Sequence, residues 1–351
     1  MYPALAVLHA IRDKAEILWV GTQGGMEAAL IQRANIPFKA IPAAGLHGVG
    51  LRNLPGNLLR LTKGYLEAGR ILRDYKPDVL FFTGGFIAGP VALAGWRIPN
   101  LLYVPDIEPG MALKLSAIFA DRIALSAEDS TRFFNRKHTI VTGYPVRPEL
   151  GRWNRETGRE QLGLSSDLPV LLVAGGSRGA RSINQAVMNN LPTLLEKMQV
   201  IHISGELDWE TIEANRGHLD QRLGNRYLAY PYLHEDMGAA LAAADLVVSR
   251  AGASTLGEYP LFGLPAILVP YPFAWRYQKV NADYLSRHGA AVILEDDQLQ
   301  QGLPLLVGEL LENPKKLQAM STAMRGLAQP DAAAKIAGQL VELAERSSDR
   351  G

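Results

Sequence analysis

The sequence predicts an α/β protein built from two doubly wound, Rossmann-like domains that face a cleft. Three observations lead to this fold class. Short apolar runs alternate with amphipathic stretches, which is the pattern of a parallel sheet with helices on both faces. This alternation begins a second time at Pro169. The length of 351 residues also exceeds what a single hydrophobic core usually organises.

Strands are expected wherever an apolar run has the length of a strand. In the first half these runs are Glu16–Val20, Val79–Phe82, Asn100–Val104, Arg122–Ala124 and His138–Val141. In the second half they are Pro169–Ala174, Val200–Ile203, Tyr227–Ala229, Leu246–Ser249, Ala266–Val269 and Ala291–Leu294. Asp331–Glu345 has apolar positions at helical spacing and is expected to form a terminal helix.

The boundary between the two domains is expected near residue 150. The segment Tyr144–Leu168 contains two prolines and a run of mixed charges, which is typical of a linker. We therefore assign residues 1–147 to a first domain and residues 148–330 to a second. Residues 331–351 are expected to form a helix that packs back on the first domain.

Composition excludes several classes of protein. Charged residues make up 20% of the chain and the formal net charge is +1, so no nucleic-acid partner is expected. Without cysteine there are no disulfides and no thiolate metal sites. The seven histidines lack metal-binding spacing and there is no G-x-S-x-G nucleophile motif, so neither a metal nor a cofactor is expected. No apolar run approaches the roughly 20 residues that span a bilayer.

The loop Arg250–Glu258 (RAGASTLGE) is the most informative motif, because it follows a buried strand and is expected to open a helix. Its small residues let a ligand approach the backbone, and a helix start presents unpaired N–H groups and a positive dipole end to a diphosphate. Glu258 is expected one turn inside the helix, where a carboxylate can accept both hydroxyls of a ribose. A turn that serves packing alone has the same pattern.

Further turns follow other expected strands. Gly175–Arg181 (GGSRGAR) combines glycines with a hydroxyl and arginines, but it lacks the GxGxxG and Walker spacings. Thr83–Phe86 is a second glycine turn, and Pro270–Asn281 mixes aromatic with amide side chains. Arg147, near the domain junction, either faces the cleft or is a solvated hinge charge. The alternative for Gly175–Arg181 is a turn that serves packing alone, and the aromatic side chains of Pro270–Asn281 can equally cover the edge of the sheet.

Together these segments resemble the MurG family of bacterial glycosyltransferases. The matching segments of the first domain are Tyr2–Val7, Val20–Thr22, Lys76–Val79, Gly84–Phe86 with Gly89-Pro90, and Gly143–Arg147. Those of the second domain are Gly175–Arg181, Glu235–Met237, Arg250–Glu258 and Gly263–Pro265. The resemblance implies a GT-B fold and inverting transfer of N-acetylglucosamine from UDP-N-acetylglucosamine to an undecaprenyl-diphosphate-linked muramoyl-pentapeptide. This reaction converts lipid I to lipid II in peptidoglycan synthesis, which serves cell shape and division.

The resemblance also assigns donor contacts. The residues implied are Arg147 and Ser177 for the nucleotide sugar, Leu233 or His234 for uracil, Ala253, Ser254 and Thr255 for the diphosphate, Glu258 for the ribose and Gln278 for the sugar hydroxyls. Gly84, Gly85 and Asp106 are expected on the acceptor side. Tyr277 stands where the family has a glutamine, so a transferase for another UDP-sugar or lipid acceptor is the alternative.

Two departures affect the acceptor half. The family has a GGTGGH loop before the segment matched by Tyr2–Val7, so we expect an upstream start site; a shortened, inactive nucleotide-sugar-binding relative is the alternative. Tyr103–Asp106 stands where the family has HEQN. Asp106 or Glu108 can take over as general base if its pKa is raised, although both can equally be solvated loop acids.

Gly48–Gly64 suggests a membrane contact, since it places leucines beside Arg52, Arg60 and Lys63. Such a surface can rest on anionic lipid of the inner leaflet, as the family does, which predicts a peripheral protein on the cytoplasmic face of the membrane. A buried helix with a basic outer face explains the same pattern.

Overall fold

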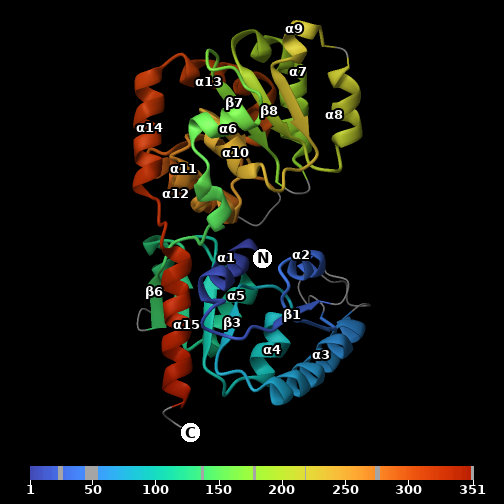
Figure 1. Cartoon of the computed structure of the whole chain (residues 1–351), viewed down its shortest axis with the longest axis vertical. Coiled ribbons are helices and arrows are strands. Elements are labelled where there is room, and N and C mark those ends of the chain that lie inside the picture. The colour runs from blue at the N-terminus through green and yellow to red at the C-terminus, as the bar shows by residue number, and fades with distance from the viewer. Residues whose placement is uncertain are drawn as a thin grey trace. The chain divides into compact units, whose positions relative to one another are not determined.

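The computed structural model describes residues 1–22, 27–43, 54–135, 138–176, 179–217, 219–272 and 277–348. The chain divides into two compact units (Figure 1). The first unit contains Met1–Pro145 together with Asp331–Gly351, and the second contains Val146–Pro330. Each unit is built on parallel strands with flanking helices, so the predicted α/β class with two Rossmann-like domains is confirmed.

The second unit contains a six-stranded parallel sheet in the order β12-β11-β10-β7-β8-β9. Its strands are β7 (Val170–Ala174), β8 (Gln199–Ile203), β9 (Tyr227–Tyr230), β10 (Leu246–Ser249), β11 (Ala266–Leu268) and β12 (Ala291–Ile293). The chain moves outward from β7 to β9 and then returns to β10 on the other side of β7. Open α/β sheets bind ligands at the carboxyl ends of the strands where the order reverses in this way.

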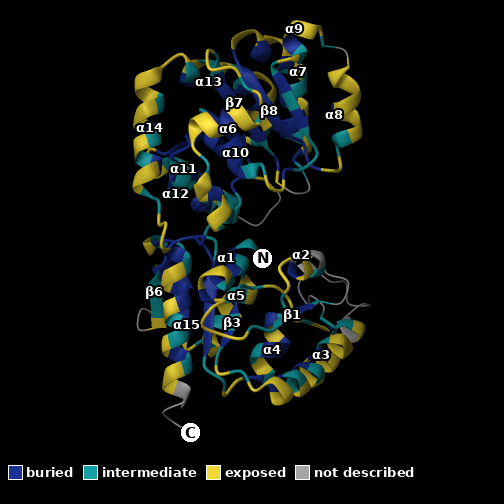
Figure 2. Cartoon of the chain, in the orientation of Figure 1, coloured by how far each residue is buried: buried dark blue, intermediate teal, exposed yellow. Residues whose placement is uncertain are grey.

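Apolar residues on both faces of this sheet form the core of the second unit. The register pairs Val247 with Leu172 and Val248 with Val173, and all four side chains are fully buried. Figure 2 shows the strands buried and the outer faces of helices such as α8 and α14 exposed. The helices and 3-10 turns of this unit are η4 (Pro148–Arg152), α6 (Arg155–Gln161), α7 (Arg181–Lys197), α8 (Trp209–Arg216), α9 (Gln221–Gly224), α10 (Met237–Ala243), η5 (Ala253–Leu256), α11 (Glu258–Phe262), α12 (Tyr277–Arg287), η6 (Asp296–Gln298), α13 (Leu299–Leu311) and α14 (Pro314–Gly326).

Much of the segment expected to be a linker is folded onto the second unit. Asn154 caps α6 by accepting a hydrogen bond from the Thr157 N–H at 2.9 Å, and the two residues form a capping box. α6 packs closely on α10, because Gly158 has no side chain: a Cβ there would lie 2.6 Å from the Ala239 carbonyl oxygen. The irregular stretch at the junction is therefore shorter than Tyr144–Leu168.

The first unit contains two groups of parallel strands. One is the sheet β3-β4-β5-β6, formed by Leu80–Phe82, Asn100–Val104, Arg122–Leu125 and Thr139–Val141. The other pairs β1 (Trp19–Thr22) with β2 (Phe38–Ile41). The helices and 3-10 turns are α1 (Tyr2–Ile11), α2 (Glu27–Arg33), α3 (Leu54–Tyr75), α4 (Ala88–Ala94), α5 (Met111–Ser116), η1 (Ala117–Phe119), η2 (Glu128–Phe133) and α15 (Ala332–Ser348).

The end of the chain belongs to the first unit. α15 packs along α1 and reaches β4 and β5. Arg122 on β5 donates to the Glu342 carboxylate at 2.8 Å and also to Gln339. Within the part of the chain that the structure describes, no helix is long and apolar enough to cross a membrane.

Candidate functional site

Three loops at the carboxyl edge of the six-stranded sheet carry most of the residues that the sequence singled out. They follow β7, β10 and β11, and their described residues are 175–176 and 179–180, 250–256, and 269–272 with the start of α12 at 277–278. These strands are neighbours in the sheet, and the order of the chain reverses between β7 and β10. The first two loops therefore lie where a doubly wound sheet is able to bind a ligand.

The loop after β7 requires glycine for two reasons, namely a positive φ and a lack of space for a Cβ. Gly176 and Gly179 have φ values of +84° and +80°, which side chains disfavour. At Gly179 there is also no room, since a Cβ would lie 2.2 Å from the Ser204 carbonyl oxygen. The loop can thus bring its backbone close to both β8 and a ligand. Ser177, a predicted donor contact, lies outside the described residues.

The loop after β10 forms the short turn η5. Thr255 donates to the Gly252 carbonyl from its backbone N–H at 3.0 Å and from its hydroxyl at 2.7 Å. The Thr255 hydroxyl is therefore used to close the turn. The first N–H groups of a helical turn have no partner within it, which leaves those of Ala253 and Ser254 to bind an anion.

Glu258 is the first residue of α11, so the expectation that it lies one turn inside a longer helix was wrong. Gly257, with φ −127° and ψ −46°, separates η5 from α11. Glu258 nevertheless remains beside the loop, because the Ser254 hydroxyl hydrogen-bonds its carboxylate. The carboxylate and the N–H groups of η5 thus belong to one local site.

Burial controls the protonation of Glu258. Part of its side chain reaches solvent, yet desolvation by the surrounding protein raises the pKa of the carboxyl group to about 7. The positive charge of Arg147 and the Ser254 hydroxyl act in the opposite direction. Arg147 belongs to the second unit, and its positive charge is near enough to Glu258 to lower the pKa of that carboxyl group.

Arg250 connects its own loop to the start of α7, to Val269 after β11 and to η6, a role that the sequence did not reveal. Its guanidinium donates to the Val269 carbonyl at 3.1 Å, to the Ser182 hydroxyl at 2.7 Å and to the Asp296 carboxylate. Its charged end lies 5.1 Å from the centre of the Tyr271 ring. No pattern in the sequence indicated Asp296, which lies 46 residues away on η6.

The remaining predicted donor residues lie on loops at the same edge. Gln278 is the second residue of α12, and its Oε1 accepts a hydrogen bond from the Tyr271 N–H at 2.9 Å. Leu233 and His234 follow β9, two strands from β7. Leu233 is buried and His234 is exposed, with the His234 and Tyr232 rings 4.6 Å apart. Of the two residues, His234 is the more accessible to the nucleobase of a ligand.

The predicted acceptor residues follow β3 and β4 in the first unit. Gly84 and Gly85 have φ values of +95° and +92°. Glu108 is buried, with its carboxylate 3.6 Å from the Lys114 ammonium group, whereas Asp106 is half-buried. Tyr103, in place of the family's histidine, is fully buried, and its hydroxyl hydrogen-bonds Ser126 at 2.7 Å. Glu108 is thus the more enclosed carboxylate and Asp106 the more accessible one.

An exposed apolar surface on the first unit was not anticipated from the sequence. Its members, here named the apolar face, are large side chains at the ends of α4 and α5 that are more than half exposed: Leu93, Trp96, Leu115, Ile118 and Phe119. The two helix ends lie together, because Asn100, shortly after Trp96, donates to the Phe119 carbonyl at 3.0 Å. Contiguous exposed apolar surface marks contact with a membrane or another protein.

The surface expected from Gly48–Gly64 lies on the neighbouring helix α3. Leu58 and Leu59 are about 60% exposed, so they do not form the buried face of a helix, and Arg60 and Lys63 are exposed beside them. Arg52 lies outside the described residues. α3 packs against α4, which makes these leucines neighbours of the helix that carries part of the apolar face.

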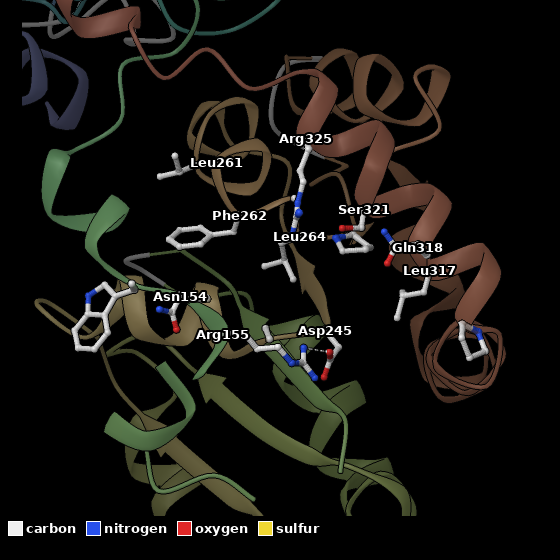
Figure 3. A pocket seen from close by; sticks show the side chains of 16 residues that line it. Asn154, Arg155, Asp245, Leu261, Phe262, Leu264, Leu317, Gln318, Ser321 and Arg325 are labelled. Carbon is white, nitrogen blue, oxygen red and sulfur yellow. Dashed lines mark hydrogen bonds and ion pairs between the residues drawn. The ribbon is translucent and has the colours of Figure 1, made fainter. Parts of the chain in front are cut away.

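A cavity of about 690 Å³ lies at the opposite edge of the second unit's sheet. It is lined by Asp245, directly before β10, and by Gly263–Pro265, directly before β11. Figure 3 shows Arg155 bonded to Asp245 across its floor, with Leu264 and Arg325 above. Because it lies at the amino ends of the strands, this cavity is separate from the three loops. No group of acidic or histidine side chains in the described ranges is able to hold a metal ion.

The fold and the loop residues define a glycosyltransferase of the GT-B class. Residues 1–125 match the N-terminal domain of glycosyltransferase family 28, and residues 170–336 match the C-terminal domain of that family. The chain belongs to the MurG family within this class.

Two relatives illustrate the match. A Roseiflexus sp. (strain RS-1) protein named UDP-N-acetylglucosamine–N-acetylmuramyl-(pentapeptide) pyrophosphoryl-undecaprenol N-acetylglucosamine transferase is 41% identical, over 99% of this chain and 93% of its own. The protein of the same name in Desulfitobacterium hafniense (strain Y51) is 42% identical, over 98% of this chain and 96% of its own.

Two solved structures share the fold. Acinetobacter baumannii MurG superposes with a TM-score of 0.73 at 25% identity, covering 97% of this chain and 95% of that one. The UDP-GlcNAc 2-epimerase of Neisseria meningitidis, solved with UDP-GlcNAc bound, superposes with a TM-score of 0.67 at 12% identity, covering 97% and 96%.

Proposed function

We propose that this protein transfers N-acetylglucosamine from UDP-N-acetylglucosamine to the undecaprenyl-diphosphate-linked muramoyl-pentapeptide, converting lipid I to lipid II in peptidoglycan synthesis. The relatives at about 40% identity carry the name of this transferase. The observation on this chain that supports the proposal best is the grouping of η5, Glu258 and Arg147 beside the reversal of strand order.

The donor is assigned to the second unit. The N–H groups of Ala253 and Ser254 bind the diphosphate, the Glu258 carboxylate accepts hydroxyls of the ribose, and Gln278 contacts the sugar. Thr255 supports the diphosphate indirectly, because it closes the turn that presents those N–H groups. Ser177 and Arg147 complete the donor contacts, and the backbone at His234 contacts uracil.

The reaction is a displacement at the anomeric carbon. A hydroxyl of the acceptor forms the new bond to that carbon while the bond to the diphosphate breaks and UDP leaves. The positive end of η5 stabilises the charge that develops on the leaving diphosphate. Asp106 takes the proton of the attacking hydroxyl, since Glu108 is buried against Lys114 and is less able to reach a substrate.

The acceptor and the membrane are assigned to the first unit and the donor to the second unit, which begins at Val146 and so includes Arg147. The apolar face, with Leu58 and Leu59 nearby, rests on the lipid that carries the acceptor. Arg60, Lys63 and Arg97 are exposed near these side chains and favour anionic lipid. The protein is accordingly peripheral, on the cytoplasmic face of the membrane.

A transfer assay with radiolabelled UDP-N-acetylglucosamine and a soluble lipid I analogue tests the proposal. The proposal predicts a labelled disaccharide product and loss of most product formation in Glu258→Ala. UDP-glucose and UDP-N-acetylgalactosamine are run in parallel, because Tyr277 replaces a glutamine of the family. Faster transfer from either would assign another donor, and donor binding without transfer to the analogue would instead indicate a nucleotide-sugar-binding protein.

A further inference from the structure

We propose that Arg250 and Tyr271 are positioning residues that orient the Gln278 side chain so that the two hydrogens on its Nε2 are presented to the sugar of the nucleotide. This inference rests on the proposed function, because it takes Gln278 as the residue that faces the donor sugar. It adds to that function a physical explanation of how the protein recognises the sugar.

Hydrogen bonds within the protein hold the guanidinium of Arg250 in place. Three of its N–H groups are used within the protein, on the Val269 carbonyl, the Ser182 hydroxyl and the Asp296 carboxylate. The side chain of Arg250 is only 11% exposed, and Asp296 neutralises its charge. The guanidinium is therefore fixed by the starts of α7 and η6 and by the end of β11, and it acts as a support for neighbouring groups.

Tyr271 rests on this support. The Arg250 guanidinium carbon lies 5.1 Å from the centre of the Tyr271 ring, within the range of a cation–π contact. Tyr271 is 45% exposed. The stacking on Arg250 thus fixes the position of the backbone of residue 271 relative to the loops after β7 and β10.

The backbone of Tyr271 in turn orients Gln278. The Tyr271 N–H lies 2.9 Å from Gln278 Oε1, and because an N–H can only donate, the atom that faces it must be the carbonyl oxygen of the amide. The two hydrogens on Nε2 remain for a ligand. A free glutamine can turn either end of its amide toward a ligand, whereas Gln278 held in this way keeps its Oε1 on the Tyr271 N–H and presents its Nε2 donors to acceptor oxygens on the sugar.

The proposal predicts that Tyr271→Ala weakens the affinity for UDP-N-acetylglucosamine more than the affinity for UDP. UDP lacks the sugar, so its binding depends on the loop after β10 and not on Gln278. Tyr271→Ala removes the ring that rests on Arg250 and frees the amide to rotate. Losing one oriented hydrogen bond corresponds to about a fivefold weaker affinity for UDP-N-acetylglucosamine. The affinity for UDP stays within about twofold, which also shows that the second unit is folded.

The experiment is isothermal titration of the full chain with UDP and with UDP-N-acetylglucosamine. The variants are Tyr271→Ala, the ring-conserving Tyr271→Phe, Gln278→Ala and the double variant Tyr271→Ala/Gln278→Ala. Tyr271→Phe keeps the ring and is expected to retain the wild-type preference for UDP-N-acetylglucosamine over UDP. The double variant is expected to lose no more affinity than Gln278→Ala alone, because both changes remove the same interaction.

Two results overturn the inference: unchanged UDP-N-acetylglucosamine affinity in Tyr271→Ala, or fully additive losses in the double variant. A purely structural role for Tyr271 would weaken UDP and UDP-N-acetylglucosamine equally, and that result also refutes the inference. Failure of the donor assignment on which the inference rests gives a different result, since the unaltered protein would then not bind UDP-N-acetylglucosamine.

Discussion

The affinity for UDP-N-acetylglucosamine is expected to rise with pH through about 7, because the donor requires Glu258 in its ionised form. Burial raises the pKa of this carboxyl group to about 7, although the charge of Arg147 and the Ser254 hydroxyl lower it. Ribose hydroxyls donate hydrogen bonds, and these favour the carboxylate over the neutral acid. Donor binding therefore selects the ionised protein and releases a proton below this pH.

The size of the effect follows from the ionised fraction. With a pKa of about 7, about a tenth of Glu258 is ionised at pH 6 and about nine-tenths at pH 8. An affinity that requires the minor form falls in proportion to its population, so binding at pH 6 should be about tenfold weaker than at pH 8. Glu258→Gln removes the titration and the carboxylate together, which predicts weak binding with a flat profile across this range.

Isothermal titration at pH 6, 7 and 8, in buffers that differ in ionisation enthalpy, measures the affinity and the number of protons released. Glu312→Gln is a matched control, since Glu312 is a surface carboxylate paired with Lys197, and its profile should match the wild type. A wild-type affinity that is independent of pH would refute the reasoning. So would a Glu258→Gln variant that keeps the tenfold change.

Three further predictions concern stability and the membrane. Burial lowers the pKa of His202 from 6.5 to about 4. The stabilisation that depends on neutral His202 is therefore fully present above pH 6.5, and the free energy of unfolding falls by about 3 kcal/mol towards pH 4. In urea unfolding, His202→Gln should reduce this dependence on pH. Gly179→Ala should destabilise the protein more than Gly176→Ala, because both have positive φ but only Gly179 lacks space for a Cβ. Ile118→Glu should weaken sedimentation with phosphatidylglycerol vesicles about tenfold, whereas Leu305→Glu, equally exposed on the second unit, should not. Equal acid sensitivity of the His202 variant, equal thermal stability of the two glycine variants, or equal vesicle binding of the Ile118 and Leu305 variants would contradict the respective prediction.

The strands of the second unit could be predicted well because they are buried on both faces. Leu246–Ser249 was predicted with the bounds that the structure has, since a continuous apolar run ends where the polar loop begins. Phe38–Ile41 was missed because its residues 39 and 40 are exposed and its run is short. β1 begins at Trp19, later than the expected Glu16, because pairing with β2 begins at Phe38 and fixes its start.

The residues of the candidate site were predicted only where the functional side chains lie within one loop. The RAGASTLGE segment carries η5 and Glu258 together, so its order along the chain was sufficient to find them. The role of Arg250 was missed because its partners Ser182 and Asp296 come from distant segments that meet only in the fold. The helix around Glu258 was predicted too long, since nothing in the sequence pattern showed that Gly257 would separate two short turns.

The crystal structure of the full chain with UDP-N-acetylglucosamine tests the central claim most directly. We predict density for the diphosphate against the N–H groups of Ala253 and Ser254 and for the ribose hydroxyls against the Glu258 carboxylate. Density for the nucleotide in the cavity beside Asp245, at the amino ends of β10 and β11, with the RAGASTLGE loop empty, would contradict it.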